Sequence, residues 1–395
     1  MPWKEACKVT LREQFIVRAL EPEVNFSELC RSFEISRKTG YKWLQRFREE
    51  GRRGLESLDR GPAPGLGRCC PEMAVDVVAL RHRKPTWGAR KIRATLLKQH
   101  EERASDVPSV RTIGRILDRA GLIQRRRRRR RKTGPGKRPE VVVQGPNDLW
   151  TVDFKGWWKS MGGRKCEPLT VRDAHSRKLL AVQLVRSTSA AEAKRVFEDL
   201  FQRYGMPVAI LSDNGPPFAV TAGLAGLTQL SAWWIALGIR FVRSRVGCPQ
   251  DNGGHERMHR DMKAELQAHP EATVEAQQAA CDVWRHEFNA HRPHEALDMK
   301  TPDSVYRRST WPYPLELGPL EYPEGFHIRK VSAAGTMRYQ GSQRRVSGAL
   351  KGYQVGVEPL PNKRFRVWFG AVCIGVGELP WKANLRPPGA DVEAR

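Results

Sequence analysis

The pattern of hydrophobic and polar positions changes several times along the chain. Apolar residues recur at helical spacing over residues 1 to about 55 and again over 71–124, with the Pro/Gly-rich stretch 61–67 between them. From Val141 the pattern alternates between strands and helices, and from about 325 to 385 it consists of short alternating strands. We therefore expect a multidomain protein with all-α modules first, a central α/β domain, and a small all-β domain last.

The first helical segment has the spacing of a helix-turn-helix. "NFSELCRSF" predicts a short helix capped by Asn25, and "EIS" a turn. Ser36 then caps a second helix that ends before Gly51. An exposed face carrying cations and amides is what a recognition helix needs, although an ordinary amphipathic pair with a solvated face has the same periodicity. The residues on that face are Arg37, Lys38, Tyr41, Lys42 and Gln45.

A second helical unit follows, with Ser109 as the cap of its last helix and Gly121 as its stop. Two tandem modules could read adjacent stretches of one DNA site, and Arg111 and Arg115 are the cations that we expect to contact it. The chain then runs through consecutive arginines, among them Arg125, Arg126, Arg127 and Arg128. Such a run repels itself and is expected to be extended, serving as a set of phosphate contacts, a solubilising linker or a localisation signal.

Charge strengthens the nucleic-acid interpretation. The 395 residues carry a formal net charge of +26, which calls for a polyanionic partner. No apolar run reaches the length of a membrane span and the N-terminal sequence has no signal core, so we expect a cytoplasmic, nucleoid-associated protein without membrane contact. The eight cysteines show no CxxC spacing, which favours reduced thiols over a zinc site or a disulfide framework.

Candidate chemistry begins at Trp150. "LWTVDFKGWW" reads as a strand with Trp150, Val152 and Phe154 on one face and Asp153 on the other. Two further strands, joined by a turn at "DAHSR", predict an antiparallel meander, and a helix capped by Ser189 follows. A short apolar strand, Val208 to Leu211, then ends just before Asp213, which is where active-site groups lie in open α/β sheets.

Three carboxylates on separate elements can converge here: Asp153, Asp213 and Glu256, the last opening a helix after a Pro/Gly loop. Without a counter-ion their repulsion would raise their pKa values. A pair of Mg²⁺ ions would resolve that conflict and promote an in-line phosphoryl displacement. The helix that begins near Glu256 also carries Arg257, Arg260 and Lys263, which would hold the nucleic acid.

Glu256 has competing interpretations. It could form an ordinary surface pair with Arg260 one turn later, and the nearby acids Asp251, Asp261 and Glu265 are rival ligands. We favour Glu256 because it follows the Pro-x-Asp-Asn loop directly, and because two Asp positions and the overall charge support the same chemistry. Asp173, in "VRDAHSRK", is expected mainly to shape a hairpin turn.

The motifs "VDFKGWW", "LSDNGPPF" and "GCPQDNGGHERMHRDMKAEL" together resemble the DDE transposase and retroviral-integrase superfamily, nearest to bacterial insertion-sequence transposases with a helix-turn-helix leader. The resemblance implies an RNase-H-like core with Asp153, Asp213 and Glu256 as catalytic metal ligands, and two Mg²⁺ ions for which Mn²⁺ can substitute. It also implies cleavage at the ends of a mobile element, 3′-hydroxyl attack on target DNA, and a homo-oligomer on double-stranded DNA. The gap between Asp213 and Glu256 is longer than is typical, which predicts a helical insertion before "IRFVRS".

Taken together, these patterns predict a series of five segments. They are a helix-turn-helix DNA-binding domain at 1–60, a winged-helix-like DNA-binding domain at 70–124, a basic linker at 125–140, an RNase-H-like catalytic domain at 141–312, and an SH3-like barrel at 320–390. Two other functions stay open at this point. One is a DNA-binding protein without catalysis, such as a repressor or a domesticated transposase, and the other is an RNase-H-type nuclease.

Overall fold

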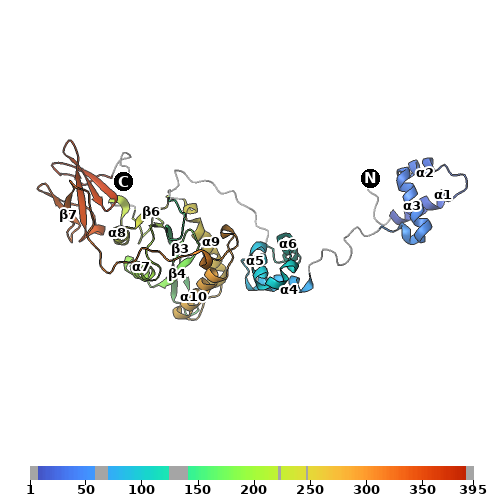
Figure 1. Ribbon diagram of the computed structural model, residues 1–395, viewed down its shortest axis with the longest axis horizontal. Coiled ribbons are helices and arrows are strands. Elements are labelled where there is room, and N and C mark those ends of the chain that lie inside the picture. Colours follow the sequence, from blue (N-terminus) through green and yellow to red (C-terminus); the bar gives the residue numbers. More distant parts are fainter. Residues whose placement is uncertain (1–7, 58–69, 124–140, 221–223, 246–247, 388–395) are drawn as a thin grey trace. The chain divides into compact units, whose positions relative to one another are not determined.

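The described residues fall into two compact units. The computed structural model describes residues 8–57, 70–123, 141–220, 224–245 and 248–387 (Figure 1). One unit is Met1–Arg68 and the other is Cys69–Arg395. The predicted linker cations Arg125 to Arg128 lie outside the described residues. Within the described ranges, no helix combines the length and the apolar character that crossing a membrane would need.

The first unit is a three-helix domain made of α1 (Lys8–Ala19), α2 (Phe26–Ser32) and α3 (Arg37–Glu50). The predicted caps are confirmed, because the Asn25 side chain accepts hydrogen bonds from the first turn of α2 and Ser36 accepts one from Thr39 N. Gly40 lets α3 approach α2 closely, since a Cβ there would lie 2.7 Å from Cys30 Sγ. The helices enclose a small core of Phe15, Ile16, Leu29, Cys30, Leu44 and Leu55.

The second unit begins with three helices, α4 (Pro71–Arg83), α5 (Ala89–Gln99) and α6 (Val110–Arg119). They share a core that includes Met73, Val77, Ile92 and Ile113. The predicted cap of α6 is confirmed, because Ser109 Oγ accepts a hydrogen bond from Thr112 N at 3.2 Å. Residues 70–123 contain helices and no assigned strand, so the winged-helix form stays a prediction.

A mixed sheet forms the centre of the second unit. Its strands are β1 (Leu149–Phe154), β2 (Trp158–Lys159), β3 (Lys165–Asp173), β4 (Leu179–Val185), β5 (Ala209–Ser212) and β6 (Arg240–Arg243). β3 pairs antiparallel with β1, β2 and β4, whereas β5 runs parallel to β1 and β6 runs parallel to β5. The order β4-β3-β1-β5-β6 confirms the predicted meander and gives the RNase-H-like arrangement.

Helices cover both faces of this sheet. On one face, α7 (Ala190–Tyr204) and α8 (Gln229–Ala236) pack against the apolar side of β1 and β3. On the other face, α9 (Gly253–Met262) and α10 (Val274–Ala290) pack against β3 and β4. A π-helical turn, Lys263–Gln267, continues α9, and the short α11 (Pro302–Val305) follows α10. Trp150 and Val152 are fully buried toward α7 and α8, so Asp153 lies on the α9 side, as predicted.

Two strand boundaries differ from the predictions. The predicted strand "LWTVDFKGWW" is divided into β1 and β2, because Gly156 adopts a positive φ of 82° that a continuous strand does not accommodate. The short apolar strand is Ala209–Ser212 instead of Val208 to Leu211, so it runs up to Asp213 itself.

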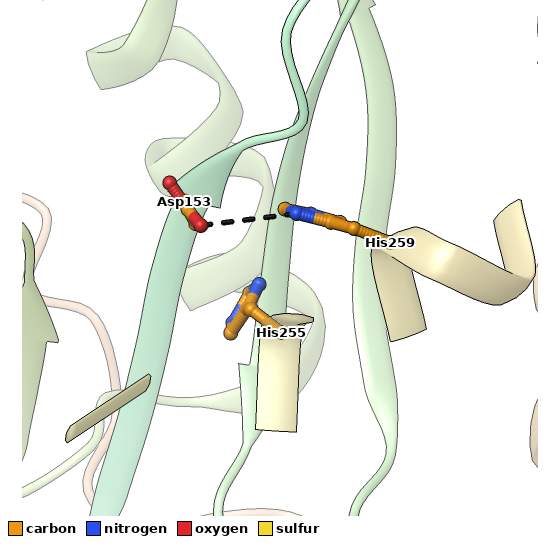
Figure 2. Close-up of side chains that lie close together, drawn as sticks. All are labelled: Asp153, His255 and His259. Atoms are coloured by element: carbon orange, nitrogen blue, oxygen red, sulfur yellow. Dashed lines mark ion pairs between the residues drawn. The ribbon is translucent and has the colours of Figure 1, made fainter. Parts of the chain in front are cut away.

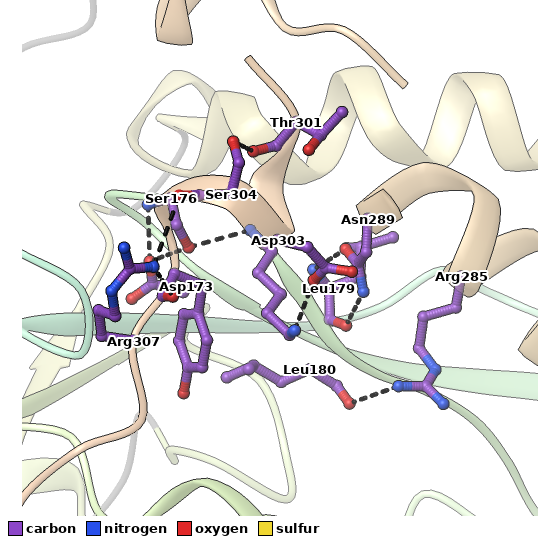
Figure 3. Close-up of polar contacts among 12 residues, drawn as sticks. Asp173, Ser176, Leu179, Leu180, Arg285, Asn289, Thr301, Asp303, Ser304 and Arg307 are labelled. Carbon is purple, nitrogen blue, oxygen red and sulfur yellow. Dashed lines mark hydrogen bonds and ion pairs between the residues drawn. The ribbon is translucent and has the colours of Figure 1, made fainter. Parts of the chain in front are cut away.

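Polar contacts fix the β3–β4 hairpin to the helices that follow (Figure 3). Asp173 accepts a hydrogen bond from Ser176 N at 2.7 Å, so it shapes this turn, as expected. It also accepts one from Asn147 N at 2.8 Å, outside the turn. Asn289 of α10 accepts from Leu179 N and donates to Leu179 O. These bonds hold α10 across the start of β4.

The segment in which the sequence predicts a helical insertion contains α8, which is buried on every side. That α8 is an insertion stays a prediction. Trp233 and Trp234 pack in the core with α7, whereas Ala232 and Ile235 pack in the core of the C-terminal strands. A helix that is apolar all round is stable only when other elements cover it completely. α8 therefore packs between the central sheet and the C-terminal domain.

The C-terminal domain consists of two small sheets around one core. β7 (His327–Lys330), β10 (Gln354–Pro359), β11 (Arg364–Phe369) and β12 (Val372–Glu378) form a four-stranded sheet, and β8 (Thr336–Tyr339) pairs with β9 (Ser342–Arg345). Val355, Phe365 and Phe369 are completely buried between them. The all-β character is as predicted, and closure into an SH3-like barrel stays a prediction.

Truncation of a buried side chain of α8 should destabilise the core. We expect Trp234→Ala to lower the free energy of unfolding by about 3–5 kcal/mol, because it leaves a cavity beside Phe197, whose ring centroid is 4.8 Å away. Trp157→Ala is the matched control, because that side chain is 55% exposed and should cost little. Calorimetric unfolding of the full chain measures both, and equal losses in the two variants would contradict the buried position of α8.

Candidate metal centre

The register of the parallel strands brings two carboxylates together. β1 and β5 pair Leu149 with Ala209 and Thr151 with Leu211. Continued by two residues, the same register places Asp153 beside Asp213, and neighbouring strands are only about 4.8 Å apart. Asp213 is exposed at the sheet edge, where its Oδ1 accepts a hydrogen bond from Gly215 N at 3.3 Å. Two of the three predicted ligands are therefore neighbours.

The environment of Asp153 opposes its ionisation. Burial raises the pKa of Asp153 to about 7, and the negative charge of Asp213 adds to that shift. Both effects disfavour the charged carboxylate, and a bound cation would remove both. This is the electrostatic behaviour that the sequence predicts for converging metal ligands.

Two histidines of α9 lie next to Asp153. His255 and His259 are one turn apart on the helix face that packs on the sheet, and Figure 2 shows both close to the aspartate. One ligand atom from each of the three residues lies within 4.8 Å of the other two. Burial lowers the pKa of His259 to about 3 and that of His255 well below its usual value, so both rings are uncharged near neutral pH.

Hydrogen bonds fix His255 within the sheet. Its Nδ1 lies 3.1 Å from Thr170 Oγ1, and its Nε2 lies 2.8 Å from Thr151 Oγ1. Both ring nitrogens are thus engaged, and the side chain has no exposed surface. His255 therefore anchors α9 to β1 and β3.

The protonation of His259 follows from Thr170. The Thr170 hydroxyl donates its single proton to Asp153 O at 2.9 Å, so it can only accept from His259 Nε2, which lies 2.9 Å away. The other nitrogen, Nδ1, then carries a lone pair and faces Asp153 Oδ2 at 3.8 Å (Figure 2). Two lone pairs at this spacing favour a proton or a metal ion between them.

Glu256 does not belong to this close group. It opens α9 between His255 and Arg257, is half-buried, and is turned about 100° around the helix from His255. Across the described ranges, no group with three ligand atoms within 4.8 Å of one another contains both aspartates and Glu256. The structure thus brings Asp153 close to Asp213 and places Glu256 one position away from the histidine that contacts the sheet.

The rival acids have other partners. Asp251 forms an ion pair with Arg245 at 2.8 Å, and the buried Asp261 forms one with Arg292. Glu265 accepts hydrogen bonds from Trp284 Nε1 at 2.7 Å and from Thr86 Oγ1 at 2.6 Å. Each of these side chains serves local structure, and the ligand role of Glu256 stays a prediction.

The sequence analysis did not include the two histidines in the site. The signal that could have found them is their spacing in "HERMH", because positions i and i+4 share a helix face. The sequence "HERMH" also matches the HExxH motif of zinc proteases. That motif needs both imidazoles free for metal, whereas both ring nitrogens of His255 contact threonine oxygens.

The described DNA-contact candidates are all exposed. On α3 they form one surface, in which Tyr41 stacks on Phe26 with ring centroids 4.3 Å apart. Arg111 and Arg115 are exposed on α6, and Arg257, Arg260 and Lys263 are exposed on and just after α9. Their positions leave every one of these cations accessible to a polyanion.

Replacement of Asp153 should stabilise the metal-free protein at high pH. The unfolded carboxyl titrates near pH 4 and the folded one near pH 7, so the wild type loses stability as the pH rises between these values. We expect Asp153→Asn to raise the free energy of unfolding by about 1–3 kcal/mol at pH 8 and by much less at pH 5. Thermal unfolding with a chelator present measures the difference. Asp199→Asn, on the exposed face of α7, is the control, and a gain independent of pH would contradict the raised pKa.

Comparison with known families agrees with this architecture. The integrase core domain family matches residues 143–249, and a second integrase core domain family matches 237–302. A helix-turn-helix domain family matches residues 11–63, and a homeodomain-like domain family matches 39–117. The core matches together span the sheet, both aspartates and α9.

Curated relatives support the same assignment. The chain is 28% identical over 232 residues to an uncharacterized 31.7 kDa protein of insertion element IS407 from Burkholderia multivorans, covering 58% of this chain and 79% of that protein. It is 26% identical over 305 residues to an uncharacterized 39.2 kDa protein of insertion element IS476 from Xanthomonas euvesicatoria, covering 71% and 84%. It is also 35% identical over 130 residues to the Gag-Pol polyprotein of avian reticuloendotheliosis virus, covering 32% and 10%.

Among solved structures, the catalytic core domain of HTLV-2 integrase with magnesium superposes with a TM-score of 0.33 at 17% identity, covering 41% of this chain and 98% of that one. The chain therefore has a core that matches integrase core domain families from β1 to α10, preceded by matches to helix-turn-helix families, and it is similar to insertion-element proteins over most of their length.

Proposed function

We propose that this protein is a DNA transposase that cleaves the ends of its own mobile element and joins the freed 3′-hydroxyl to target DNA. The observation that carries the proposal is the parallel register of β1 and β5, which, continued by two residues, places Asp153 beside Asp213 within a core that matches integrase families. The helix-turn-helix matches favour a duplex DNA substrate over an RNA–DNA hybrid, because such modules read the major groove.

The donor set fits a hard divalent cation. Asp153 and Asp213 supply carboxylate oxygens whose mutual repulsion a cation would relieve, and Mg²⁺ prefers such ligands together with water and phosphate. Glu256 is the third ligand in the proposal. A different side-chain rotamer of Glu256, in the first turn of α9, would direct its carboxylate to the aspartates. Bound ions would activate the attacking oxygen and stabilise the leaving one. We expect a pair of Mg²⁺ ions, for which Mn²⁺ can substitute.

The chain's own residues orient this site. Thr170 donates to the backbone of Asp153 and accepts from His259, which fixes the aspartate strand relative to α9. Uncharged imidazoles next to the carboxylates add no positive charge that would compete with a metal ion. Arg257, Arg260 and Lys263 lie on and just after the same helix, where they would hold the phosphates of the substrate strand.

Recognition of the element ends is assigned to the helical modules. The exposed face of α3 combines cations with Tyr41 and Gln45, and α6 adds Arg111 and Arg115. One active site for each DNA end implies at least a dimer on the DNA. The assembly would therefore contain two copies of this chain and both ends of the element.

Removal of any one of the three carboxylates should abolish strand transfer and leave DNA binding unchanged. We expect Asp153→Asn, Asp213→Asn and Glu256→Gln each to reduce strand transfer by at least about a hundredfold, because each loses a ligand for the ions that stabilise the reacting oxygens. The assay uses DNA from the flanks of the coding region with Mg²⁺ or Mn²⁺, and end binding is followed by fluorescence anisotropy.

Asp251→Asn, in the loop before α9, is the matched control. Because the Asp251 carboxylate pairs with Arg245, any loss of strand transfer in this variant should come with reduced thermal stability. Strand transfer that persists in all three ligand variants would eliminate the site. Cleavage of an RNA–DNA hybrid in preference to duplex ends would replace the transposase proposal with a nuclease.

The exposed face of α3 should carry sequence-independent contacts. We expect Lys38→Ala and Lys42→Ala each to weaken binding to duplex DNA and to reduce the slope of log affinity against log salt by about one. Arg18→Ala is the control, because it removes an exposed cation of α1 instead of α3. Anisotropy titrations over a range of salt concentrations measure the slope, and an unchanged slope in both lysine variants would exclude α3 as the DNA-facing helix.

A further inference from the structure

A second site lies on the α9 side of the sheet, apart from the aspartates. It is a cavity of about 910 Å³ bounded by the start of β1, the end of β3, the first turns of α9 and the segment after α10. Leu149, Arg172, Gly254 and Arg292 are among its lining residues, whereas Asp153, Asp213 and His259 are not. The cavity is therefore distinct from the proposed metal centre.

The cavity contains three arginines that form no ion pair within the described chain. Arg172, Arg177 and Arg257 line it, and over the described ranges no carboxylate lies within ion-pair distance of their guanidinium groups. The acids that line it are already paired, Asp251 with Arg245, Asp261 with Arg292 and Glu295 with Arg90. Lys91 lines it as a further cation, and the buried Asp173 lies near Arg172 but is held by hydrogen bonds from the hairpin turn.

Several cations face one another at close range. Arg172 is buried, with 6% of its surface exposed. Burial, together with the charge of Arg177, lowers the pKa of Arg172 to about 9. Burial and the surrounding cations, Lys91 first, likewise lower the pKa of His294 to about 3, so this ring is uncharged. Such a cluster is costly without an anion.

Unsatisfied polar atoms also lie among these lining residues. The buried Nε atoms of Arg177 and Arg292 and the Nε2 atom of His294 have no hydrogen-bond partner among the described residues. Buried polar atoms without partners are rare in folded proteins, and a place in a ligand site is one of the few physical reasons for them.

Gly254 makes this arrangement possible. A Cβ at this position would lie 1.4 Å from a guanidinium nitrogen of Arg172, so only glycine lets that side chain cross the start of α9. Gly253 and Gly254 both line the cavity, where the positive end of the helix adds to the arginines. The second glycine of "DNGG" thus has a packing role beyond the turn itself.

We propose that this cavity binds a phosphate ester, with a nucleotide as the class that fits both of its walls. Guanidinium groups match phosphate oxygens in pairs, and Leu149, Leu211 and Phe288 form an apolar wall suited to a sugar or base. The phosphate belongs either to a DNA strand or to a free nucleotide or pyrophosphate. The proposal does not depend on the metal centre or on the transposase function.

Chemical protection tests the site in the unmodified full-length protein. Phenylglyoxal modifies accessible arginines, and peptide mass spectrometry reports each one. We expect pyrophosphate at ten times its dissociation constant to slow modification of Arg177 and Arg257 by about tenfold, and to leave the exposed Arg186 outside the cavity unchanged. A 5′-phosphorylated tetrathymidylate is the second probe and represents a DNA strand.

Variants give an independent measurement. We expect Arg177→Gln combined with Arg257→Gln to raise the dissociation constant of the probe that binds by at least about tenfold, and Arg186→Gln to change it by less than about twofold. Arg172→Met removes the buried charge, and Gly254→Ala displaces Arg172 without a change in charge; far-UV circular dichroism confirms that each variant folds.

The two probes separate the two sources. Protection by pyrophosphate supports a free phosphate compound, whereas protection by the oligonucleotide alone supports a phosphate of a DNA strand. If neither probe protects Arg177 or Arg257, or if the double variant binds both probes as tightly as the wild type, the cavity is not a phosphate site and the proposal is wrong.

Discussion

The catalytic core depends on the repulsion between two carboxylates that strand register forces together. Asp153 and Asp213 continue paired positions on β1 and β5, so the register of the two strands keeps them neighbours. Burial of Asp153 removes water from around its carboxylate, and the charge of Asp213 adds to the effect, so the pKa of Asp153 rises. The neighbouring imidazoles are uncharged and give no compensation. The fold therefore carries an electrostatic cost that a divalent cation or a proton can offset, and this cost is the physical basis for assigning metal chemistry to the site.

Sequence reasoning works best where local physics decides the outcome. Helix caps at Asn25, Ser36 and Ser109 depend on a few adjacent residues, and the side of β1 that bears Asp153 follows from period-two alternation. The role of His259 could not be predicted in the same way, because it depends on the single proton of Thr170, a residue far away in sequence. The unpaired arginines of the cavity are a similar case, since only the tertiary structure shows which acids are already engaged. The net charge of the sequence indicates the class of partner. It does not indicate where in the structure charges without an ion-pair partner lie together.

The segment between Asp213 and Glu256 takes part in packing between domains. α8 buries Trp233 and Trp234 against α7 and presents Ala232 and Ile235 to the C-terminal sheets, so these residues form an interdomain core instead of a loop. After α8, β6 continues the sheet in parallel with β5. The length of this segment therefore reflects domain packing as well as the spacing of the candidate ligands.

α9 connects the two sites because its first turns serve both. His255 fastens the helix to β1 and β3 by contacts to two threonine hydroxyls, and His259 faces Asp153 from the next turn. At the start of the same helix, the absent side chain of Gly254 admits Arg172, which is the neighbour of Thr151 across β1 and β3. A displacement of α9 would therefore shift Glu256 relative to the aspartates and Arg257 relative to Arg172 together. If a phosphate group binds the arginines, it stabilises one position of the helix and so one position of Glu256. Because α9 lies against both the proposed phosphate site and the proposed metal ligands, its placement would couple the two sites without any further moving part.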